Sequence, residues 1–490
     1  MTDALTQLRS MQAADLPVHG GRTLAYVYDS GLPDIDRIGR EAVAAYAGSN
    51  GLDPTAFPSL LRMETEVVGM AADLLNAPES VVGTVTSGGT ESVLLAVQAA
   101  RDAHRGIEQS RIERPRMVLP STAHAAFHKA AHYFGVEPVL VPVGPDFRAD
   151  PAAMAAAMDE RTVLVVASAP SYAHGVVDPV TEIAAAAAER GIRCHVDACI
   201  GGWVLPYAMR LGRDVPAWTF AVEGVTSISV DLHKYAYAPK GTSVLLHRTP
   251  ELRRPQFFAS AAWPGYTMLN STMQSTKSGG PLAGAWAVLR SLGDEGYERL
   301  ARDVFEAVDR IRAGVGEMPE VAVVSTPDST LLALTTDGSC DPFTVCDEMA
   351  VRGWYVQPQM SFAGSPATIH LSVSAATLPH VPELLAALAE AVAAAAAAGP
   401  VTVDPAVATF IGDLDPYSLS EEDFDGLLLA AGLVGAAGAE GDPSTSSGHR
   451  LALPQRMAEV NAMLDLASAA MREALLVAFL DRLTRPTRRR

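Results

Sequence analysis

Apolar positions along the chain alternate between two spacings, and this alternation predicts a fold of mixed strands and helices. Between residues 81 and 247, short apolar runs are separated by longer segments in which apolar residues recur every three or four positions. The runs predict strands at 81–86, 116–119, 137–141, 163–167, 193–197, 227–230 and 242–247. The segments between them predict helices at 91–105, 125–134, 151–158 and 180–190. Strands that alternate with helices of about ten residues are typical of an α/β fold with a mainly parallel sheet.

The regions on either side depart from this alternation. Residues 1–60 are rich in turn signals and predict an irregular arm with one helix near 34–48, and the spacing in 60–76 predicts another helix. Helices are expected at 281–292 and 296–315. The pattern that follows predicts a small α+β domain, with strands at 321–325, 330–335, 355–357 and 368–373 and helices at 343–352 and 378–398.

The last ninety residues form a region of different composition. Residues 435–448 are rich in Gly, Ala and Ser and predict a flexible linker. A short helix is expected at 418–430, and residues 457–483 carry one apolar helical face, typical of packing on the protein's own body or on another subunit. We therefore expect four parts: an N-terminal arm (1–60), a large domain (61–300), a small C-terminal domain (301–399) and a helical extension (400–490).

Composition narrows the class of protein without identifying it. The chain has 490 residues, of which 49% are hydrophobic and 19% charged, and its net charge is 37 − 56 = −19. Such an acidic chain is a poor candidate for nucleic-acid binding, because phosphate backbones require a cationic face. The four cysteines match no zinc or redox spacing and suit a reducing compartment. No apolar stretch of about 18 residues predicts a membrane span, and no signal peptide is evident, so we expect a cytoplasmic protein.

A His-Lys pair, His233 and Lys234, follows the strand predicted at 227–230. In α/β folds, ligands bind at the edge of the sheet where parallel strands end. Apolar and aromatic neighbours are expected to desolvate Lys234, which lowers the pKa of an amine and makes it a nucleophile towards carbonyl groups. For an isolated His-Lys pair, an ordinary surface lysine is the simpler interpretation.

Asp197 ends an earlier apolar strand, 37 residues before Lys234 (234 − 197). A nearly buried aspartate needs a cationic partner, and a protonated pyridine nitrogen is one such partner. An ordinary aspartate in a turn or at a helix start is the alternative interpretation.

Two further elements lie at the starts of predicted helices. Gly88, Gly89 and Thr90 lie between a strand and a helix, where free N–H groups and the helix dipole favour an anion such as phosphate. His124 follows the next strand and could lie flat on an aromatic ring. Each element by itself is weak, because glycine turns and histidines at helix starts are common.

Together, in this order, the four elements resemble the fold-type I pyridoxal-phosphate enzymes of the group II decarboxylase family. Within that family the chain looks most like the soluble bacterial sphingosine-1-phosphate lyases, over about residues 26–375. The resemblance rests on five segments: TSGGTESVLLA (86–96), STAHAAFHKAAHYFG (121–135), SAPSYAHGVVDP (168–179), HVDACIGG (195–202) and SISVDLHKYAYAPKG (227–241). It implies a large domain with a mainly parallel seven-stranded sheet, a small α+β domain, and pyridoxal 5'-phosphate as the cofactor.

The resemblance also implies roles for individual residues. Lys234 would bind the cofactor aldehyde as a Schiff base, Asp197 would pair with the pyridinium nitrogen, and His124 would stack on the ring. Groups around the cofactor phosphate would be Gly88, Gly89, Thr90, His233 and Thr276. Thr276 lies in a loop, 275–280, which in the family reaches the phosphate of the neighbouring subunit, so the resemblance implies a homodimer with active sites at the interface. Substrate-binding residues would be Tyr28, Asn50, Asp53, Tyr172 and Lys240.

The residues expected around the substrate depart from the lyase pattern at one position. Asp53 stands where the lyases have a histidine, and a carboxylate beside a substrate phosphate is repulsive. A turn aspartate before Pro54 is an equally good interpretation. The favoured function is cleavage of the C2–C3 bond of a 2-amino-3-hydroxy, sphingoid-base-1-phosphate-like substrate by retro-aldol chemistry, with Lys234, Tyr172 or a cofactor phosphate oxygen as the base or acid.

Two alternatives stay open from the sequence. The first is a decarboxylase acting on an aromatic or acidic L-amino acid. The second is a non-catalytic relative in which residues 401–490 are the working part. No metal site is expected, and the expected partners are a small amine substrate and a second copy of the chain, with no nucleic acid.

Overall fold

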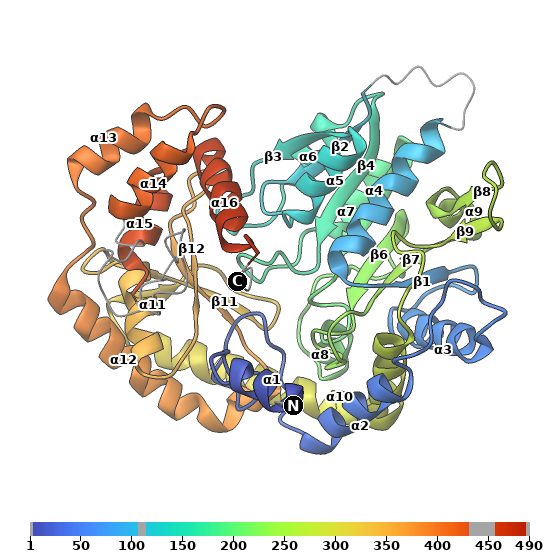
Figure 1. Cartoon of the computed structure of the whole chain (residues 1–490), viewed down its shortest axis with the longest axis horizontal. Helices are drawn as coiled ribbons and strands as arrows, with labels where there is room; N and C mark the ends of the chain where they lie inside the picture. Colours follow the sequence, from blue (N-terminus) through green and yellow to red (C-terminus); the bar gives the residue numbers. More distant parts are fainter. Residues whose placement is uncertain (1–2, 106–113, 431–455, 487–490) are drawn as a thin grey trace. The chain divides into compact units, whose positions relative to one another are not determined.

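The computed structural model of the protein describes residues 3–105, 114–430 and 456–486. The chain divides into two compact units (Figure 1). The first unit consists of Met1–Ala313, Val323–Ala333 and Leu371–Pro382, and the second consists of Gly314–Ala322, Leu334–His370 and Glu383–Arg490. The linker predicted at 435–448 lies outside the described residues.

A seven-stranded sheet forms the centre of the first unit (Figure 1). Its strands follow the spatial order β1-β7-β6-β5-β4-β2-β3, in which β7 is antiparallel to both neighbours and the other pairs are parallel. The α/β fold with a mainly parallel seven-stranded sheet is therefore confirmed. The strands are β1 (Val82–Thr86), β2 (Arg116–Pro120), β3 (Glu137–Val141), β4 (Thr162–Ser168), β5 (Arg193–Asp197), β6 (Val225–Asp231) and β7 (Ser243–His247).

Helices cover this sheet, and α4 packs against five of its strands: β1, β4, β5, β6 and β7. The helix buries apolar residues at helical spacing, among them Val93 and Val97, as the sequence pattern requires. The helices of this unit are α1 (Ala4–Gln12), α2 (Pro33–Ala45), α3 (Pro58–Leu74), α4 (Gly89–Arg105), α5 (Ala126–Phe134), α6 (Pro151–Ala157), α7 (Val180–Glu189), α8 (Leu205–Arg210), α9 (Pro250–Arg253) and most of α10 (Gly279–Val315). A two-stranded sheet of β8 (Phe258–Ser260) and β9 (Met268–Asn270) completes it.

The two helices predicted at 281–292 and 296–315 are confirmed, because the backbone of Gly293, with φ 57° and ψ −178°, is not helical and interrupts α10 between them. One helix prediction needed correction. The apolar face predicted over 457–483 divides into two helices, because the hydroxyl of Ser468 accepts a hydrogen bond from the N–H of Met471 at 3.2 Å and caps the second one. The sequence analysis missed α1, α8, α9 and α13 and the strands β8 and β9.

The second unit has a four-stranded sheet, helices α11 (Pro342–Val351) and α12 (Val381–Ala398), and a C-terminal helical cluster. The sheet order is β10-β11-β13-β12, made of β10 (Val321–Val323), β11 (Leu331–Thr336), β12 (Gln357–Gln359) and β13 (Thr368–Ser372). The cluster has its own apolar core and consists of α13 (Pro405–Asp413), α14 (Glu421–Ala430), α15 (Ala458–Leu466) and α16 (Ala469–Leu483). Asp347 on α11 accepts hydrogen bonds from the N–H groups of Met457 and Ala458, at 2.9 and 2.8 Å, and so fastens the start of α15.

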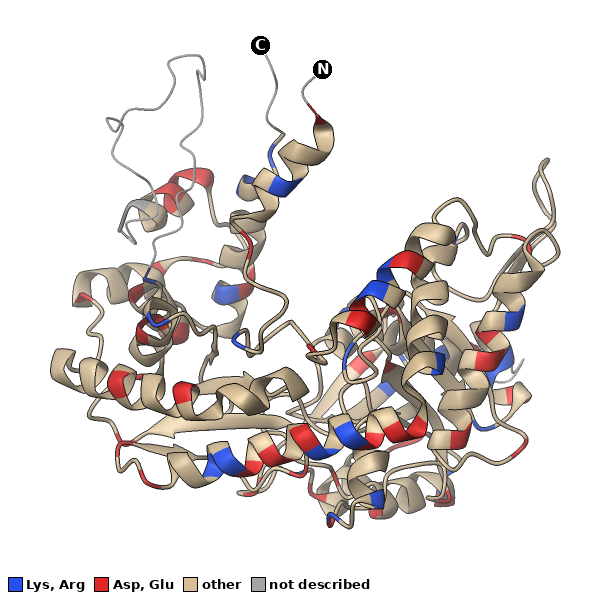
Figure 2. Cartoon of the chain, turned by 90° about the horizontal axis from the view of Figure 1, so that it is seen from below, with Lys and Arg blue, Asp and Glu red and all other residues tan. Residues whose placement is uncertain are grey.

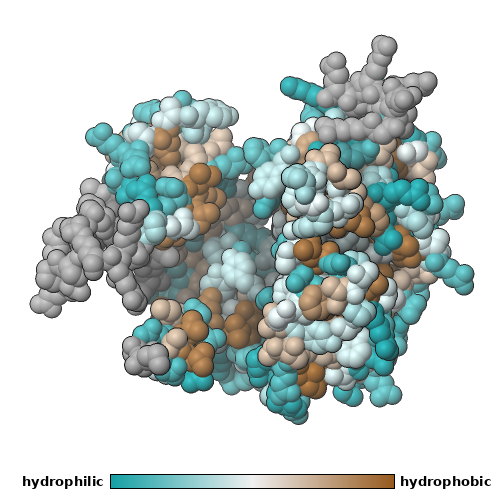
Figure 3. All heavy atoms as spheres, turned by 45° about the vertical axis from the view of Figure 1, so that its right-hand side comes forward, coloured by the Kyte–Doolittle hydropathy of each residue, from teal (hydrophilic) through white to brown (hydrophobic). Residues whose placement is uncertain are grey.

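The surface shows no sign of a broad charged or apolar belt in the views drawn. Acidic and basic residues are interspersed along the helices in Figure 2, and hydrophobic residues form scattered patches on the face shown in Figure 3. One described helix, Ala375–Ala398, is long and apolar enough to cross a membrane, but 39% of its most apolar window is buried inside the protein. The core helix of a soluble protein passes the same test, so this is weak evidence for a span. The four cysteines are free and buried, as expected.

Gly201 provides a test of how closely the segment after β5 packs. A Cβ atom at Gly201 would lie 2.3 Å from the carbonyl oxygen of Ala169 and 2.4 Å from Leu205 Cδ1. We expect Gly201→Ala to lower the free energy of unfolding by about 3 kcal/mol, because a backbone carbonyl cannot move aside cheaply. Denaturant unfolding measures this.

The matched control is Gly69→Ala in α3, where the added Cβ meets nothing within 4 Å. It should leave stability unchanged or raise it by about 0.5–1 kcal/mol. Equal stability of the two variants would contradict the close packing at Gly201.

Candidate active site

A pocket of about 350 Å³ opens at the edge of the large sheet where β1, β4, β5 and β6 end. It brings together seven residues that the sequence analysis selected from distant segments: Gly88, Gly89, Thr90, His124, Asp197, His233 and Lys234. Tyr172 also lines the pocket. The parallel register brings these residues together. Ser168 pairs with Asp197 and Asp197 pairs with Ser229, so β4, β5 and β6 end at the same edge of the sheet.

The start of α4 forms one wall of the pocket. Gly88 lies at φ 156° just before the helix, and Gly89 is its first residue. A Cβ atom at Gly89 would lie 2.7 Å from Asp231 Oδ2 and 2.8 Å from Cys199 Sγ, so only glycine fits there. Glu91 accepts the N–H of Ser87 at 2.6 Å and holds the turn. The helix N-terminus therefore faces the pocket with free N–H groups and the positive end of its dipole.

Asp197 is 8% exposed and is held by its neighbours on the next strand. Its Oδ1 accepts the N–H of Cys199 at 3.1 Å and the hydroxyl of Ser229 at 3.4 Å. Ser229 also lies 3.2 Å from Nε2 of His195, whose Nδ1 lies 2.9 Å from Ser227 Oγ. Burial lowers the pKa of His195 to about 4, so at neutral pH this histidine is uncharged and orients Asp197 without neutralising it.

Lys234 corrects one expectation of the sequence analysis. Desolvation was expected to lower the pKa of Lys234, and burial does act in that direction. However, Asp231 Oδ2 lies 2.9 Å from Lys234 Nζ. Burial is the largest single influence, but the charge and hydrogen bond of Asp231, together with Tyr28 and Cys199, exceed it, so the pKa of Lys234 is raised above its ordinary value. The amine is therefore an ammonium at neutral pH in this cofactor-free chain.

Aromatic side chains line the entrance to the pocket. Tyr172 meets the ring of His124 edge to face, with centroids 6.5 Å apart, and Tyr28 meets Tyr235 in the same way at 5.0 Å. The Nδ1 atom of His124 accepts the N–H of Ala126 at 3.1 Å, so its proton is on Nε2 when the ring is neutral. Burial raises the pKa values of Tyr28 and Tyr172, so both phenols remain protonated and act as hydrogen-bond donors.

Lys240 lies beside these phenols. Its Nζ atom lies 5.0 Å from the centre of the Tyr28 ring and donates to the carbonyl oxygens of Tyr26 at 2.9 Å and His233 at 3.4 Å. Desolvation and then the charge of Lys234 lower the pKa of Lys240 to about 8. Lys240 is therefore a cation at neutral pH that loses its charge readily in mild alkali.

Five predicted site residues are not among those that line this chain's pocket: Tyr28, Asn50, Asp53, Lys240 and Thr276. Asn50 forms a bridge with Ser278, and Asp53 is an exposed turn residue whose Oδ1 accepts the N–H and hydroxyl of Thr55 at 2.8 and 2.7 Å. Those hydrogen bonds lower the pKa of Asp53. Thr276 is exposed, in a loop that is anchored at Lys277 by an ion pair with Glu64 at 3.2 Å. Lys277 is therefore already paired within its own chain.

Two pocket residues, Asp231 and Cys199, were missed as candidates from the sequence. Asp231 is 3% exposed and Cys199 is 7% exposed. Asp231 is the last residue of β6, as Asp197 is the last residue of β5, and it lies two residues beyond Ser229, which pairs with Asp197. An acid at the end of an apolar strand was the signal that selected Asp197, and it applies equally to Asp231.

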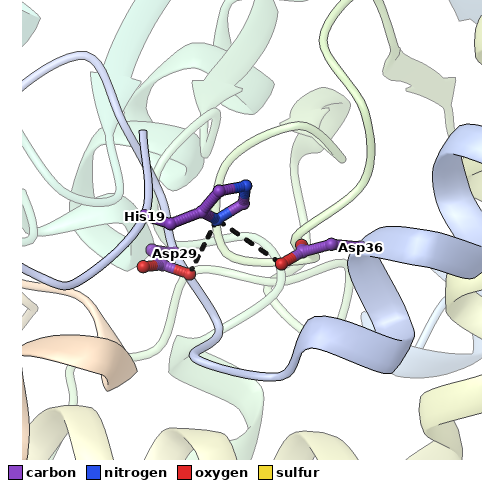
Figure 4. Close-up of side chains that lie close together, drawn as sticks. All are labelled: His19, Asp29 and Asp36. Carbon is purple, nitrogen blue, oxygen red and sulfur yellow. Dashed lines mark ion pairs between the residues drawn. The ribbon is translucent and has the colours of Figure 1, made fainter. Parts of the chain in front are cut away.

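A separate group at the N-terminal arm has side chains close enough to hold a metal ion (Figure 4). His19 Nδ1 lies 3.5 Å from Asp29 Oδ1 and 3.4 Å from Asp36 Oδ2. The oxygens of Asp29 already accept the N–H groups of Gly20 and Gly31, at 2.7 and 3.0 Å. These contacts describe an ion-pair cluster that fastens the arm.

Profiles of known families match two parts of the chain. The pyridoxal-dependent decarboxylase conserved domain matches residues 26–335, which is 310 of the 490 residues (335 − 26 + 1). The chain belongs to the pyridoxal-dependent decarboxylase family. A second profile, described as "Pyridoxal-dependent enzyme, C-terminal putative HTH domain", matches residues 405–482, which is the helical cluster of the second unit.

Similar proteins include both lyases and a decarboxylase. The sphingosine-1-phosphate lyase of Arabidopsis thaliana is 41% identical over 368 residues, which cover 74% of this chain and 66% of the plant protein. A probable L-tyrosine/L-aspartate decarboxylase of Methanothermobacter thermautotrophicus is 30% identical, over 74% of this chain and 94% of that protein. The solved sphingosine-1-phosphate lyase of Burkholderia pseudomallei has a TM-score of 0.75 and 36% identity, and the match covers 85% of this chain and 94% of that one. The chain spans less than two thirds of the length of the first three curated relatives.

The family's cofactor is pyridoxal 5'-phosphate, and the residues of the pocket fit it. The N-terminus of α4, where Gly88, Gly89 and Thr90 line the pocket, suits a phosphate. Lys234 is the amine that can bind the aldehyde, and the recorded hydrogen bonds of Asp197 among the described residues go to Oδ1, which leaves Oδ2 for a pyridinium N–H. A buried carboxylate beside a group that must be kept protonated is the arrangement that this chemistry requires.

Gly89→Ala tests the start of α4 as the phosphate site. We expect the dissociation constant for pyridoxal 5'-phosphate to rise about tenfold or more, because the new methyl group would push Asp231 and Cys199 into the pocket. Titration of the visible absorption band measures this. Thr90→Ser, which keeps the hydroxyl at the next position, is the control and should bind nearly as the wild type does. Equal affinity of Gly89→Ala would show that the cofactor does not use this wall.

Proposed function

We propose that the protein is a pyridoxal-phosphate-dependent carbon–carbon lyase of the sphingosine-1-phosphate lyase kind. It cleaves the C2–C3 bond of a 2-amino-3-hydroxy substrate carrying a phosphate, by retro-aldol chemistry, to an aldehyde and an amine such as phosphoethanolamine. The observation that carries the proposal is the grouping of one cation, Lys240, with two protonated phenols, Tyr28 and Tyr172, beside the reactive Lys234. The identity to lyases of this name supports the same substrate class.

These three groups suit a phosphate dianion. A lysine cation and phenolic O–H groups supply charge-assisted hydrogen bonds to phosphate oxygens. Asp53, which raised doubt about a phosphate, is exposed and bound to its own turn through Thr55, so in this chain its carboxylate is not among the pocket groups. The local charge around Lys234 and Lys240 therefore matters more for the substrate than the total of −19.

The chain's own residues would divide the work as follows. When bound, the cofactor supplies an electron sink for the bond that breaks. Asp197 would hold the proton on the cofactor's ring nitrogen, and His124 would cover the ring. Tyr172 remains protonated, so it suits donation of a proton or hydrogen bond to the substrate's oxygen and is a poor base at neutral pH.

A decarboxylase acting on an L-amino acid is the second candidate, and one relative favours it. The Methanothermobacter thermautotrophicus protein named as a probable L-tyrosine/L-aspartate decarboxylase matches over nearly its whole length. Against this, no arginine is among the described residues that line the pocket, so no guanidinium is placed there to hold a substrate carboxylate.

The assembly belongs to the same proposal. Asn50, Asp53 and Thr276 lie outside their own chain's pocket, whereas the family resemblance gives them cofactor and substrate roles. We infer a cytoplasmic homodimer in which these residues complete the partner's site. We also propose that the chain has four parts: an arm (1–60), a large domain (61–300), a small domain (301–399) and an extension (400–490).

The C-terminal extension is proposed to act without nucleic acid, despite its helix-turn-helix name. Residues 405–482 contain 12 acidic and 4 basic residues, a net charge of −8. The described arginines there are paired: Arg456 with Glu348, Arg472 with Asp465, and Arg482 with Asp425. A surface with this balance repels phosphate backbones.

Product analysis tests the lyase proposal. The wild type with sphinganine 1-phosphate should release a long-chain aldehyde, and Lys234→Ala should lose both this activity and the visible band of the bound cofactor. A panel of aromatic and acidic amino acids serves as the comparison, with carbon dioxide as the measured product. Carbon dioxide release without any aldehyde would replace the lyase with the decarboxylase.

Lys240→Met tests the phosphate site. We expect KM for the phosphorylated substrate to rise about tenfold or more at pH 7, because a charge-assisted hydrogen bond of about 1.5–3 kcal/mol is lost. In the wild type, KM should rise as the pH passes about 8, where Lys240 loses its charge, and this rise should be absent in Lys240→Met. Lys129→Met, at an exposed lysine over Tyr133, is the control and should follow the wild type. A pH-independent wild-type KM would contradict the assignment.

A further inference from the structure

Asp231 is the buried acid of the pocket to which neither the family resemblance nor the proposed function assigns a role. Its carboxylate is 3% exposed, and Oδ2 lies 2.9 Å from Lys234 Nζ. The other oxygen, Oδ1, is also buried, and no hydrogen bond to it from the described residues meets ordinary geometry. Burying a carboxylate next to a lysine amine costs desolvation free energy, so such a pair points to a functional role.

The position of Asp231 is fixed from three sides. It ends β6, and its strand neighbours pair with β5 and β7. It packs closely on Gly89, where a Cβ would lie 2.7 Å from Oδ2. His233 Nε2 lies 3.7 Å from the same oxygen. These contacts place the carboxylate beside the lysine amine.

We propose that Asp231 is a positioning residue that holds the uncombined amine of Lys234 as an ammonium pointing into the pocket. In this state the amine can donate a proton to a group in the pocket, and it must first give up a proton before it can attack the cofactor aldehyde. Capture of the cofactor is therefore limited by deprotonation at neutral pH. This role is independent of whether the bound substrate loses an aldehyde or carbon dioxide.

Some groups around Lys234 stabilise its charged amine, and others destabilise it. Asp231 favours the charged amine, whereas burial and the nearby cation of Lys240 oppose it. The remaining groups that face Lys234 from neighbouring elements are protonated and neutral at pH 7: Tyr28, Tyr172 and the thiol of Cys199. Burial lowers the pKa of His233 and keeps it neutral too. Asp231 is therefore the carboxylate that forms an ion pair with Lys234. The two other acids that line the pocket, Asp197 and Glu91, accept backbone N–H groups instead.

The chain's composition makes a direct measurement possible. Only four lysines occur in the sequence: Lys129, Lys234, Lys240 and Lys277. Limiting acetic anhydride, applied to the full-length cofactor-free protein over a pH series, labels each amine according to its unprotonated fraction. Mass spectrometry then gives a separate pH midpoint for each lysine. The exposed Lys129 serves as the internal reference.

In the wild type we expect the labelling midpoint of Lys234 to lie above that of Lys240, although both lysines belong to the same region. In Asp231→Asn, which keeps the shape and removes the charge, the Lys234 midpoint should fall by about one to three pH units. The midpoint of Lys129 should not move. Capture of pyridoxal 5'-phosphate at pH 7, followed by the visible band, should become about tenfold faster or more.

Asp294→Asn is the matched control, because it removes one carboxylate from an ion pair with Arg210 outside the cofactor pocket. It should leave the Lys234 midpoint and the capture rate unchanged. An unchanged Lys234 midpoint in a folded Asp231→Asn would overturn the proposal. If that variant does not fold, the wild type decides: a Lys234 midpoint at or below that of Lys240 would overturn it. Because no substrate is used, failure here is distinct from failure of the lyase proposal.

Discussion

The parallel pairing of β4, β5 and β6 is the constraint on which the rest of the site depends. Parallel strands end at the same edge of a sheet, and the register sets Ser168 beside Asp197 and Asp197 beside Ser229. This pairing places the Asp197 carboxylate and the Lys234 amine in one pocket, although 37 residues separate them in the chain (234 − 197). The antiparallel β7 then brings Ser243 opposite Asp231.

Buried charge is the second organising feature. Asp197, Asp231 and Lys234 lie inside an acidic protein, and each is tolerated because a specific partner meets it. Asp231 meets Lys234, while Asp197 is held by N–H and hydroxyl donors and keeps one oxygen for a cationic ring. His195, which is neutral, lies within hydrogen-bond distance of Ser229, whose hydroxyl donates to Asp197, and so adds no charge to the site.

The helical cluster near the C-terminus has its own apolar core. Its apolar core includes Phe424, Met471 and Leu475, and Asp347 binds the first N–H groups of α15, so the cluster is fastened to α11 of its own unit. Residues 405–482 carry a net charge of −8, which is why we propose that the cluster acts without nucleic acid. A structural or regulatory contribution to the second unit agrees better with these contacts.

The sequence by itself determined the α/β class, every strand of the large sheet to within two residues, and the segments that carry Gly89, His124, Asp197 and Lys234. Apolar periodicity and local motifs depend on near neighbours, so they can be read without the fold. The break at Gly293 was predicted from the sequence, whereas the division at Ser468 was not, because the cap there depends on a single local hydrogen bond. Only the tertiary structure decided that Asp231 meets Lys234 and reverses the expected shift of its pKa, and that Asp53 and Thr276 lie outside their own chain's pocket. The physical reason is that charge interactions depend on distances through space, which the order of residues along the chain does not fix.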